Sequence, residues 1–550
     1  MAAKVPTNYP IQNRWLKPVT VALLAALVLA VAVLASTPPT SRDALIHHLA
    51  VPKLYLEQGG MVEIPSLPFS YYPSNLGLLY WASLALGSDI AAKYIHFTFA
   101  LLTAGIVFAY LRNRAGTFYG LLGALILLST PVVIRLSTMV YVDLGLLFFS
   151  SASLLALFQW RRSRYKVKWL LMAAVACGLA LGTKYNALIS LLLLAFMTGI
   201  LYVRDPEHRR KRIVGSLAFM SLFCGVTLLV FSPWMIRNYR WTGNPVYPLY
   251  QKFFSTQTPS RAASESLSFG PLAFRALVYG ERDWQIALLP FRIFFQGKDD
   301  DPRYFDARLN PMLLLLLPFA FLKPRSASDP WKLEKWMMLG FAGLFILMAM
   351  CTQSVRIRYF LPALTPLALL TVFGVQSLAD RFSRRDARLV LGVSVGFFLT
   401  LNLYYLMDLY QRVEPLRYLS GALSRSEYLN AKLPTYAPLE FINRHLPDNA
   451  SVFFILVGNQ GYYCDRAYGY DHPPSGATLH NVLKLASSPR DVNDLFKQKG
   501  YSHILVSEPR LMRWADTNFT EAEKQLMFGF FREAAHRIYF KNGFGIYELT

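Results

Sequence analysis

An acid and an imidazole lie four residues apart in the segment 40–60, TSRDALIHHLAVPKLYLEQGG. Its polar start and its closing pair of glycines predict a helix, with Pro52 as the one breaker inside it. On that helix Asp43 and His47 share a face, because four residues make about one turn. A carboxylate or an imidazole can act as the general base that removes a proton from a hydroxyl group. The alternative is that Asp43 only complements the helix dipole, while His47 and His48 are polar residues at a membrane interface.

A second acid and several cations occur where apolar segments of the chain end. Asp143 closes the sequence RLSTMVYVD, and the cations are Lys184, Arg237, Arg240, Arg356 and Arg358. Charged side chains are costly inside a bilayer, so these groups belong at its surface or around a wet cavity. Acids and cations on one side of a membrane are suited to binding an anionic lipid headgroup and activating a hydroxyl group. For each residue alone, a side chain that only extends to the lipid headgroups is the alternative.

The composition predicts a membrane protein rather than a soluble enzyme. Of the 550 residues, 54% are hydrophobic and only 16% are charged. The formal net charge of +23 comes from basic residues clustered in short loops, a pattern that sets orientation in a membrane, and no nucleic-acid motif accompanies it. The four cysteines stand in apolar segments or alone, so a disulfide framework is not expected.

Apolar runs recur through the first three quarters of the chain. We interpret the first run, which follows a basic stretch, as an uncleaved helix with the N-terminus in the cytoplasm. The basic short loops mark the cytoplasmic ends of the later runs, which puts the C-terminal region outside. We expect about eleven spans, at residues 19–35, 90–111, 118–134, 144–160, 169–182, 188–203, 213–234, 310–322, 336–351, 360–379 and 389–407.

The sequence divides into two predicted domains. Residues 1–409 form the transmembrane domain, with outer loops at 37–89 and 235–309, and residues 410–550 form a soluble extracytoplasmic domain. In the second domain SVFFILV and SHILVS are typical of buried strands, and a helical segment lies between them. The final RIYFKNGFGIYEL predicts a hairpin that turns at Asn542-Gly543. The fold class is therefore a polytopic α-helical membrane protein with a C-terminal α/β domain that has some parallel strand pairing.

Six segments spread in order over nearly the whole chain resemble the polyprenyl-phosphate-sugar-dependent glycosyltransferases of the GT-C fold. They are RDALIHHLAVPKLYLEQGG, YVDLGLLFF, GTKYNAL, PWMIRNYRWTGNPVYPL, RIRYFLPALTPLALL and DLFKQKGYSHILVSEP. Relatives in this group include the protein O-mannosyltransferases and the aminoarabinose transferases that act on lipid A. The resemblance implies an enzyme of the bacterial inner (plasma) membrane that serves the cell envelope. It implies inverting transfer of a sugar from a polyprenyl-phosphate donor to a hydroxyl of a lipid, glycan or protein, among membrane lipids and without nucleic acid.

The resemblance also implies roles for individual residues. The acid of the first outer loop, Asp43, acts as the catalytic base or helps to bind a metal, with His47 as a second catalytic candidate. The acid of the second outer loop, Asp143, orients the acceptor or shares a divalent ion. The residues implied to contact the donor phosphate are Arg356, Arg358 and Tyr359, with Lys184 and Arg237 as weaker assignments. Apart from the resemblance, weak candidates for contact with the acceptor or the sugar are His48, Tyr72 and Lys53. For Tyr72 the alternative is a place in the aromatic belt at the membrane interface.

Metal dependence stays open at this point. Carboxylate and imidazole groups suit several divalent ions, so Asp43, His47 and Asp143 are candidate ligands. Many relatives carry paired acids in the first outer loop, whereas in this sequence Arg42 precedes Asp43.

A transporter or flippase for a lipid-linked sugar is the alternative function. It predicts broken or polar segments near the middle of the membrane and an internal repeat. The charged residues instead lie at the outer ends of the predicted spans, and the sequence has no clear repeat. A non-catalytic scaffold with a receptor-like outer domain is disfavoured only by the clustering of acids and bases.

Overall fold

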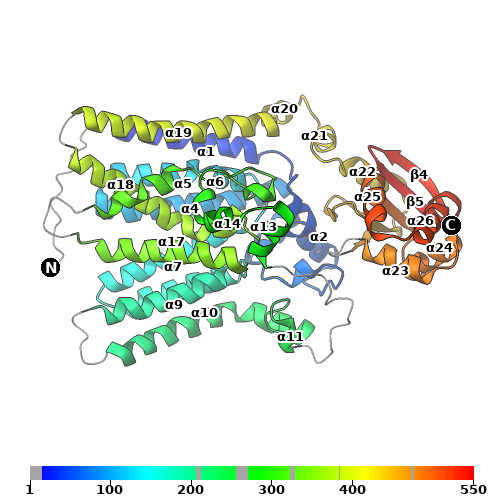
Figure 1. Ribbon diagram of the computed structural model, residues 1–550, viewed down its shortest axis with the longest axis horizontal. Helices are drawn as coiled ribbons and strands as arrows, with labels where there is room; N and C mark the ends of the chain where they lie inside the picture. Colours follow the sequence, from blue (N-terminus) through cyan, green and yellow to red (C-terminus); the bar gives the residue numbers. More distant parts are fainter. Residues whose placement is uncertain are drawn as a thin grey trace. The chain divides into compact units, whose positions relative to one another are not determined.

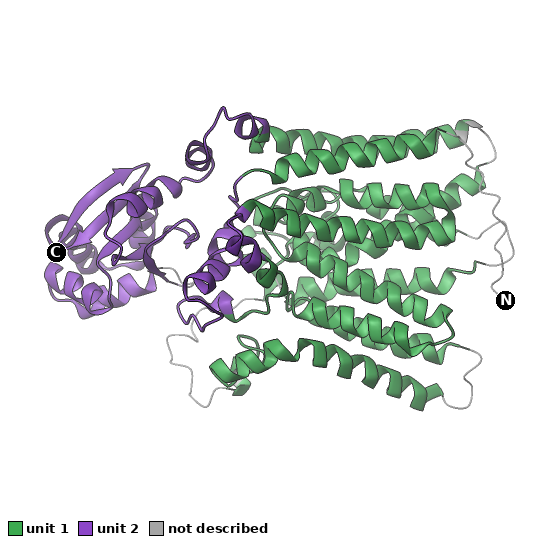
Figure 2. Cartoon of the chain, turned by 180° about the vertical axis from the view of Figure 1, so that it is seen from behind, with its two compact units in different colours: residues 1–37, 71–79, 90–415 green, residues 38–70, 80–89, 416–550 purple. Residues whose placement is uncertain are grey.

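The computed structural model describes residues 15–205, 212–254, 270–322, 329–352, 354–382, 385–471 and 476–550. The chain folds into two compact units, which Figure 2 shows in different colours. Unit 1 comprises residues 1–37, 71–79 and 90–415, and unit 2 comprises residues 38–70, 80–89 and 416–550. The segment that carries Asp43 therefore belongs to the same unit as the C-terminal part of the chain.

Unit 1 is built from long apolar helices that lie side by side with roughly parallel axes (Figure 1). Among the described residues, seven helices are long and apolar enough to cross a bilayer, and a bent pair makes an eighth span. The seven are α1 Leu16–Ala35, α4 Asp89–Ala115, α7 Asp143–Arg162, α10 Arg212–Thr242, α17 Lys332–Thr352, α18 Leu364–Arg381 with the 3-10 turn before it, and α19 Arg385–Val413. The shorter apolar helices are α8 Val167–Leu181, α9 Ala187–Val203 and the stretch Met312–Phe321, which begins with α16 Met312–Leu315. Each predicted span thus corresponds to an apolar helix or helix pair, and the protein is an integral membrane protein.

The bent pair is one predicted span that is broken in two. The sequence predicts a continuous helix at 118–134, whereas α5 Thr117–Ser129 and α6 Pro131–Ser137 meet at a bend of 66°. Pro131 explains the break, because it has no N–H to continue the helix and disfavours helical geometry in the residue before it. Thr130 is accordingly extended, with ψ 127°. Pro131 then begins α6, where the missing N–H has no partner to lose.

In the described part of the predicted outer loop 235–309 lie the short helices α11 Gln251–Phe254, α13 Pro271–Tyr279, α14 Asp283–Ala287 and α15 Leu289–Arg292. A buried carboxylate connects α13 with α15, because Glu281 accepts hydrogen bonds from Arg275 at 2.7 Å and from Arg292 at 2.9 Å. Burial by itself raises the pKa of Glu281, but the hydrogen bonds from the two arginines outweigh it and hold the pKa below its ordinary value of 4.5. Glu281 is therefore negatively charged at neutral pH, and this charge holds the two arginines of the loop together.

Unit 2 contains a five-stranded mixed sheet with the strand order β2-β1-β3-β5-β4. The strands are β1 Ser451–Ile455, β2 Ala467–Tyr470, β3 His503–Ser507, β4 Ala535–Lys541 and β5 Phe544–Leu549. Strand β1 pairs in parallel with β2 and β3, and β5 pairs antiparallel with β3 and β4. The predicted parallel pairing and the hairpin are confirmed, and Asn542 and Gly543 both adopt positive φ at the turn. The sequence did not predict β2, a four-residue strand that contains a glycine.

Alternation of side chains along the strands gives this sheet two apolar faces. Phe453 and Ile455 of β1 pack with residues of α23 Ala477–Leu485, α24 Pro489–Gln498, α25 Glu508–Asn518 and α26 Glu521–Gly529. Val452 and Phe454, on the other face, pack with residues of α22 Tyr436–His445 and α2 Ala50–Glu57. Helix α21 Arg425–Lys432 packs on the turn before α2 through Leu45. Residues 38–70 of the first outer loop thus pack on the sheet as part of unit 2.

Candidate active site

A buried ion pair between an acid and a lysine lies at the centre of a charged cluster in unit 1. Lys184 Nζ donates a hydrogen bond to Asp143 Oδ1 at 2.7 Å. Asp143 is 1% exposed, so its charge is removed from water and needs this partner. The other carboxylate oxygen, Oδ2, is also buried and accepts no hydrogen bond from any described residue. A buried acceptor without a donor is costly, and a hydroxyl group of a ligand can supply the missing hydrogen bond.

A buried histidine and the beginning of α7 position this acid. Asp143 is the first residue of α7, where the helix dipole favours a carboxylate. His96 of α4 is fully buried, and its Nε2 accepts a hydrogen bond from the N–H of Leu144 at 3.0 Å. Its Nδ1 faces the carbonyl oxygens of Leu136 and Met139, each at 2.9 Å, and therefore carries the ring proton. One neutral imidazole thereby joins the end of α6 to the beginning of α7.

The turn between α8 and α9 holds Lys184 in place. Asn75, the first residue of α3 Asn75–Ala85, donates its side-chain amide to the carbonyl of Leu179 at 3.1 Å. The backbone N–H of Asn75 bonds to the carbonyl of Gly182 at 2.8 Å. A Cβ at Gly182 would lie 2.4 Å from the Asn75 side chain, so only glycine allows this approach. Asn75 of α3 therefore fixes the GTKYNAL turn between α8 and α9, and this holds the backbone of Lys184 in position.

Two aromatic rings and a second cation complete the cluster. Lys184 Nζ lies 4.7 Å from the ring centroid of Tyr359. The guanidinium of Arg358 lies 5.0 Å from the ring centroid of Tyr141 and 5.2 Å from that of Tyr359. Contacts of a cation with a ring face are favourable where water is excluded, and Arg358 is only 7% exposed. The structure thus brings together four predicted site residues, Asp143, Lys184, Arg358 and Tyr359.

Arg356, which the sequence places beside them, pairs with an acid of the outer loop. Its Nη1 donates a hydrogen bond to Asp306 Oδ2 at 3.2 Å. Asp306 also lies 3.6 Å from Arg135 of α6, and Asp299 connects Arg135 at 3.5 Å with Arg412 at 2.9 Å. This network balances three arginines with acids, so contact of Arg356 with a phosphate requires its ion pair with Asp306 to open or to be shared.

Arg237 holds the backbone that leads into α3. Its Nη2 donates to the carbonyl of Tyr71 at 2.6 Å and to the carbonyl of Tyr72 at 3.2 Å. Its guanidinium also lies 4.6 Å and 4.8 Å from the ring centroids of Trp234 and Trp241. With these contacts Arg237 acts on the predicted site through the position of Tyr72.

Tyr72 borders the cluster around Lys184. Its ring centroid lies 5.6 Å from that of Tyr185, the residue next to Lys184. Burial raises the pKa of Tyr72, and the nearby phenol groups of Tyr359 and Tyr247 add to this effect. Tyr72 therefore stays protonated at neutral pH and is able to donate a hydrogen bond.

In unit 2 the segment 40–60 is not the regular helix that the sequence predicts. Residues Ala44–His48 form a π-helical turn, closed by the bond from the N–H of Leu49 to the carbonyl of Ala44 at 2.8 Å, and α2 follows. Pro52 accounts for the irregularity, because it offers no N–H to the carbonyl of His48 and its ring crowds that carbonyl. Asp43 stands directly before this turn and is half-buried. Turns of this kind are frequent at functional sites.

Of the two histidines after Asp43, His47 stacks on an aromatic ring and contacts His48 in a tilted arrangement. The His47 ring lies 4.5 Å from Phe69 at an interplanar angle of 19°, and 4.0 Å from His48. Both imidazoles are half-buried. Asp43 and these histidines belong to unit 2, whereas Asp143 and the residues around it belong to unit 1. The structure therefore describes two groups, and their joint action stays a prediction.

Lys53, a predicted contact for the acceptor, ties α2 to the loop after β1. Its ammonium group donates to the carbonyls of Tyr462 at 3.0 Å and Cys464 at 2.8 Å, and to Asp465 Oδ1 at 2.7 Å. Three hydrogen bonds use all the protons of an ammonium group. In this arrangement Lys53 supports the first outer loop.

The predicted metal ligands are divided between the units. Asp43 and His47 lie in unit 2 and Asp143 lies in unit 1, so this set stays a prediction. Within the residues that the structure describes, no group of three or more His, Cys, Asp or Glu side chains could hold a metal ion.

Sequence reasoning missed His96, Tyr141 and Asn75. One signal was available for His96, because an imidazole inside an apolar span is expensive and usually has a specific partner. Tyr141 and Asn75 carry no such signal, since their roles depend on residues far away in the chain.

Comparisons with known proteins agree with this architecture. Residues 77–242 match the family described as dolichyl-phosphate-mannose-protein mannosyltransferase. No curated protein sequence matches the chain. The structure of ArnT from Cupriavidus metallidurans in the apo state is similar, with a TM-score of 0.57, 15% identity, and coverage of 96% of this chain and 97% of that chain. The structure of that protein bound to undecaprenyl phosphate is also similar, with a TM-score of 0.55, 14% identity, and coverage of 96% and 98%.

A third similar structure is an oligosaccharyltransferase from Archaeoglobus fulgidus tethered to an acceptor peptide. Its TM-score is 0.55 at 10% identity, and the match covers 98% of this chain and 74% of that chain. At such identities the likeness establishes the fold. The chain has the GT-C fold of membrane glycosyltransferases over nearly its whole length, as its sequence predicts, and its residues 77–242 match the protein mannosyltransferase family.

Proposed function

We propose that the protein is a membrane glycosyltransferase that moves a sugar from a polyprenyl-phosphate donor to a hydroxyl group of a lipid, glycan or protein. Transfer takes place at the extracytoplasmic face of a bacterial inner membrane, with the N-terminus in the cytoplasm and the C-terminal region outside. The GT-C fold and the match of residues 77–242 to the mannosyltransferase family support this proposal. The undecaprenyl phosphate and the acceptor peptide in the related structures support the choice of donor and acceptor.

The observation that carries the proposal is the half-satisfied carboxylate of Asp143. An ion pair that only stabilises the fold would have both carboxylate oxygens paired, because an unmet buried acceptor costs about 1–3 kcal/mol. Lys184 occupies Oδ1, and Oδ2 is buried without a hydrogen bond from any described residue. We assign Oδ2 to a second hydrogen-bond donor of the acceptor, beside the hydroxyl group that attacks, so that Asp143 orients the acceptor while the proton of the attacking hydroxyl stays free for the base.

The reaction is an inverting substitution at the anomeric carbon. Asp43 takes the proton of the acceptor hydroxyl, with His47 as a neighbouring group on the same turn. The acceptor oxygen forms a bond to the anomeric carbon from the side opposite the phosphate. The bond from that carbon to the phosphate oxygen breaks, and its electron pair leaves with the polyprenyl phosphate. Attack from the opposite side inverts the configuration of the sugar.

Cations stabilise the charge that builds on the departing phosphate. Arg358 is buried and stacked on Tyr141 and Tyr359, so its guanidinium needs little reorganisation when charge develops. Lys184 supports Asp143 and lies over the same Tyr359 ring. Arg356 adds a third cation when its ion pair with Asp306 opens.

Transfer of labelled sugar from a panel of polyprenyl-phosphate sugars to candidate acceptors tests the proposal. Purified wild type is compared with Asp43→Asn and Asp143→Asn, each with and without a chelator. Asp516→Asn is the matched control, because this carboxylate is 74% exposed. We expect a loss of roughly a hundredfold or more in the first two variants and none in the control. Full activity of Asp43→Asn rejects its role as base, and loss of activity with chelator assigns a metal.

A transporter for the same lipid-linked sugar is the second candidate. The bend of 66° between α5 and α6 is the kind of broken span that such transporters use. If the donor binds and crosses vesicle membranes but is never consumed in the presence of acceptors, the protein is the transporter.

A further inference from the structure

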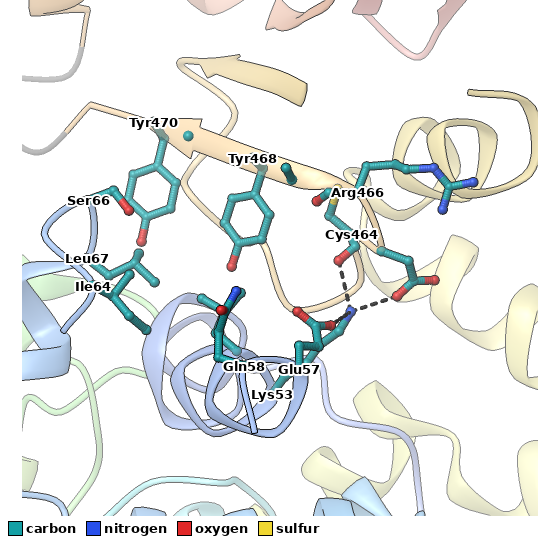
Figure 3. A pocket seen from close by; sticks show the side chains of 14 residues that line it. Lys53, Glu57, Gln58, Ile64, Ser66, Leu67, Cys464, Arg466, Tyr468 and Tyr470 are labelled. Carbon is teal, nitrogen blue, oxygen red and sulfur yellow. Dashed lines mark hydrogen bonds and ion pairs between the residues drawn. The ribbon is translucent and has the colours of Figure 1, made fainter. Parts of the chain in front are cut away.

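Unit 2 contains a cavity between the first outer loop and the edge of its sheet. The cavity has a volume of about 290 Å³, at the lower end of the size of ligand pockets. One wall is formed by Tyr468 and Tyr470 of β2, and the facing wall by Gln58 and Ser66 (Figure 3). The cavity lies wholly within unit 2. Of the predicted site residues only Lys53, a weak candidate for contact with the acceptor, lines it, and none of the residues given a role in the proposed reaction does.

Strand geometry creates the aromatic wall. Tyr468 and Tyr470 are two residues apart on one strand and so project from the same face. Their rings are nearly parallel, at 14°, with centroids 6.2 Å apart. Phe454 of the neighbouring β1 stacks on Tyr468 at 5.4 Å and 8° and fixes its plane. Among the described strands, β2 lies at the edge of the sheet.

The remaining lining combines apolar side chains with polar groups, and its two cations are already paired. Figure 3 shows the hydroxyl of Tyr468 pointing toward Gln58, at the end of α2. Lys53 donates to two carbonyls and to Asp465 and lies 3.8 Å from Glu57. The second cation of the lining, Arg466, donates to backbone carbonyls and lies 3.0 Å from Asp448. Lys53 and Arg466 are both paired with carboxylates, so the cavity offers a phosphate group no unpaired cation to bind.

We propose that this cavity binds a neutral saccharide. A sugar ring has apolar C–H faces that pack on aromatic rings, and hydroxyl groups that hydrogen-bond to amide, carboxylate and phenol groups. Tyr468 and Tyr470 supply the aromatic surface, and the amide of Gln58 and the carboxylate of Glu57 supply neutral and acidic hydrogen-bonding groups. The balance of charge excludes a phosphorylated sugar. The site goes beyond the transfer reaction, because it is assembled from residues that the reaction does not use.

Binding of soluble sugars to the purified full-length protein tests this site without any transfer. Methyl α-mannoside, a mannobiose, N,N′-diacetylchitobiose and a galactobiose are examined by saturation-transfer NMR, with mannose 6-phosphate and inorganic phosphate as anionic probes. We expect at least one neutral sugar to bind and both anionic probes to fail. If no neutral sugar binds, or if phosphate binds more tightly than every sugar, the proposal is overturned.

Substitutions locate the binding. Gln58→Ala is expected to weaken the affinity about tenfold, which corresponds to one lost hydrogen bond. Its matched control is Gln498→Ala, because both glutamines are exposed at the C-terminal end of a helix of unit 2. Tyr468→Phe keeps the ring, while Tyr468→Ala removes it, so the second variant should lose more affinity. Tyr539→Phe, on β4, controls for loss of a phenol elsewhere in the sheet. Equal binding by Gln58→Ala, Gln498→Ala and Tyr468→Ala overturns the assignment to this cavity.

A competition experiment identifies the source of the sugar. If an excess of a short prenyl-phosphate sugar displaces the bound saccharide, the cavity accepts a phosphorylated sugar and the proposal of a neutral saccharide site is overturned. If it does not, the cavity holds a glycan of the acceptor. Because Asp43 and Asp143 do not line the cavity, Asp143→Asn should abolish transfer and leave saccharide binding unchanged. Failure of the transfer proposal and failure of the saccharide site are thereby separate results.

Discussion

Lys184 Nζ lies 2.7 Å from Asp143 Oδ1, although the two residues are 41 positions apart in the chain. The lysine comes from the turn between α8 and α9, and the acid from the first residue of α7. The pair neutralises a carboxylate that is almost completely buried, while its second oxygen keeps the capacity to bind a ligand. This combination of a stabilised charge and an open acceptor is the feature that we regard as functional.

Replacing Lys184 and replacing Asp143 should affect stability and transfer to different extents. Lys184→Met should lower stability by about 3 kcal/mol, because it leaves a buried charge without its partner. Asp143→Asn should remove transfer with a smaller loss of stability. The double variant should recover much of the stability of Lys184→Met but none of the transfer. Thermal unfolding in detergent and the transfer assay measure both quantities, and independent, additive losses of stability would contradict the pairing.

His96 should act through the position of α7. His96→Gln can keep an acceptor for the N–H of Leu144, whereas His96→Asn is too short and leaves that N–H unsatisfied. We expect His96→Asn to lose more transfer than His96→Gln, with a cost in stability of about 1–3 kcal/mol. Single-turnover rates at saturating donor measure the effect. Equal rates in the two variants would mean that the bond to Leu144 does not position Asp143.

The two arginines before α18 should differ in importance. Arg358 is stacked within the cluster, whereas Arg356 is paired with Asp306. We therefore expect Arg358→Lys to weaken donor binding and transfer by about tenfold or more, since lysine lacks the planar guanidinium. Arg356→Lys should have a smaller effect. Donor titrations of both variants measure the difference, and a larger loss in the Arg356 variant would show that its ion pair opens during the reaction.

Stability should depend on pH through Glu281. Its pKa in the folded protein lies below the ordinary value of 4.5, so it binds a proton less readily in the folded than in the unfolded state. The stabilisation is therefore present above pH 4.5 and is lost as the pH falls through the lower pKa of the folded state. Glu281→Gln should lower the unfolding temperature at pH 7, with a difference from wild type that shrinks as the pH falls below 4.5. Glu521→Gln, at an 83% exposed side chain, is the control and should show no such convergence.

Cysteine labelling checks both burial and orientation. Burial raises the pKa of the Cys464 thiol to about 11, so little reactive thiolate exists at neutral pH. Cys351 is exposed and is the second-last residue of α17. With a membrane-impermeant maleimide added to intact cells at pH 7, we expect Cys351 to be labelled and Cys464 not. Cys351→Ser should abolish the signal, and labelling that requires opened cells would reverse the proposed orientation.

Prediction from the sequence was most successful where the determinant is local. The eleven predicted spans match apolar helices because hydrophobic length is a local property of the chain. The hairpin at Asn542-Gly543 follows from the ability of these two residues to adopt positive φ. The helix at 40–60 and the span at 118–134 were predicted as regular, and the structure interrupts both next to a proline. Each of the two segments contains a proline, but whether the helix responds with a π-helical turn or with a bend depends on the residues packed around it.

The sequence alone therefore determined the membrane class, the spans, the α/β character of the C-terminal region and the types of residues available for chemistry. These features depend on composition and on short-range periodicity, and both can be read from short stretches of the sequence. Only the tertiary structure decided that Asp143 pairs with Lys184, that Arg356 pairs with Asp306, and that Lys53 supports a loop. Each of these contacts joins segments that are far apart in the chain. Helix packing chooses such partners by shape and by the cost of leaving a buried charge unpaired, and no local pattern encodes that choice.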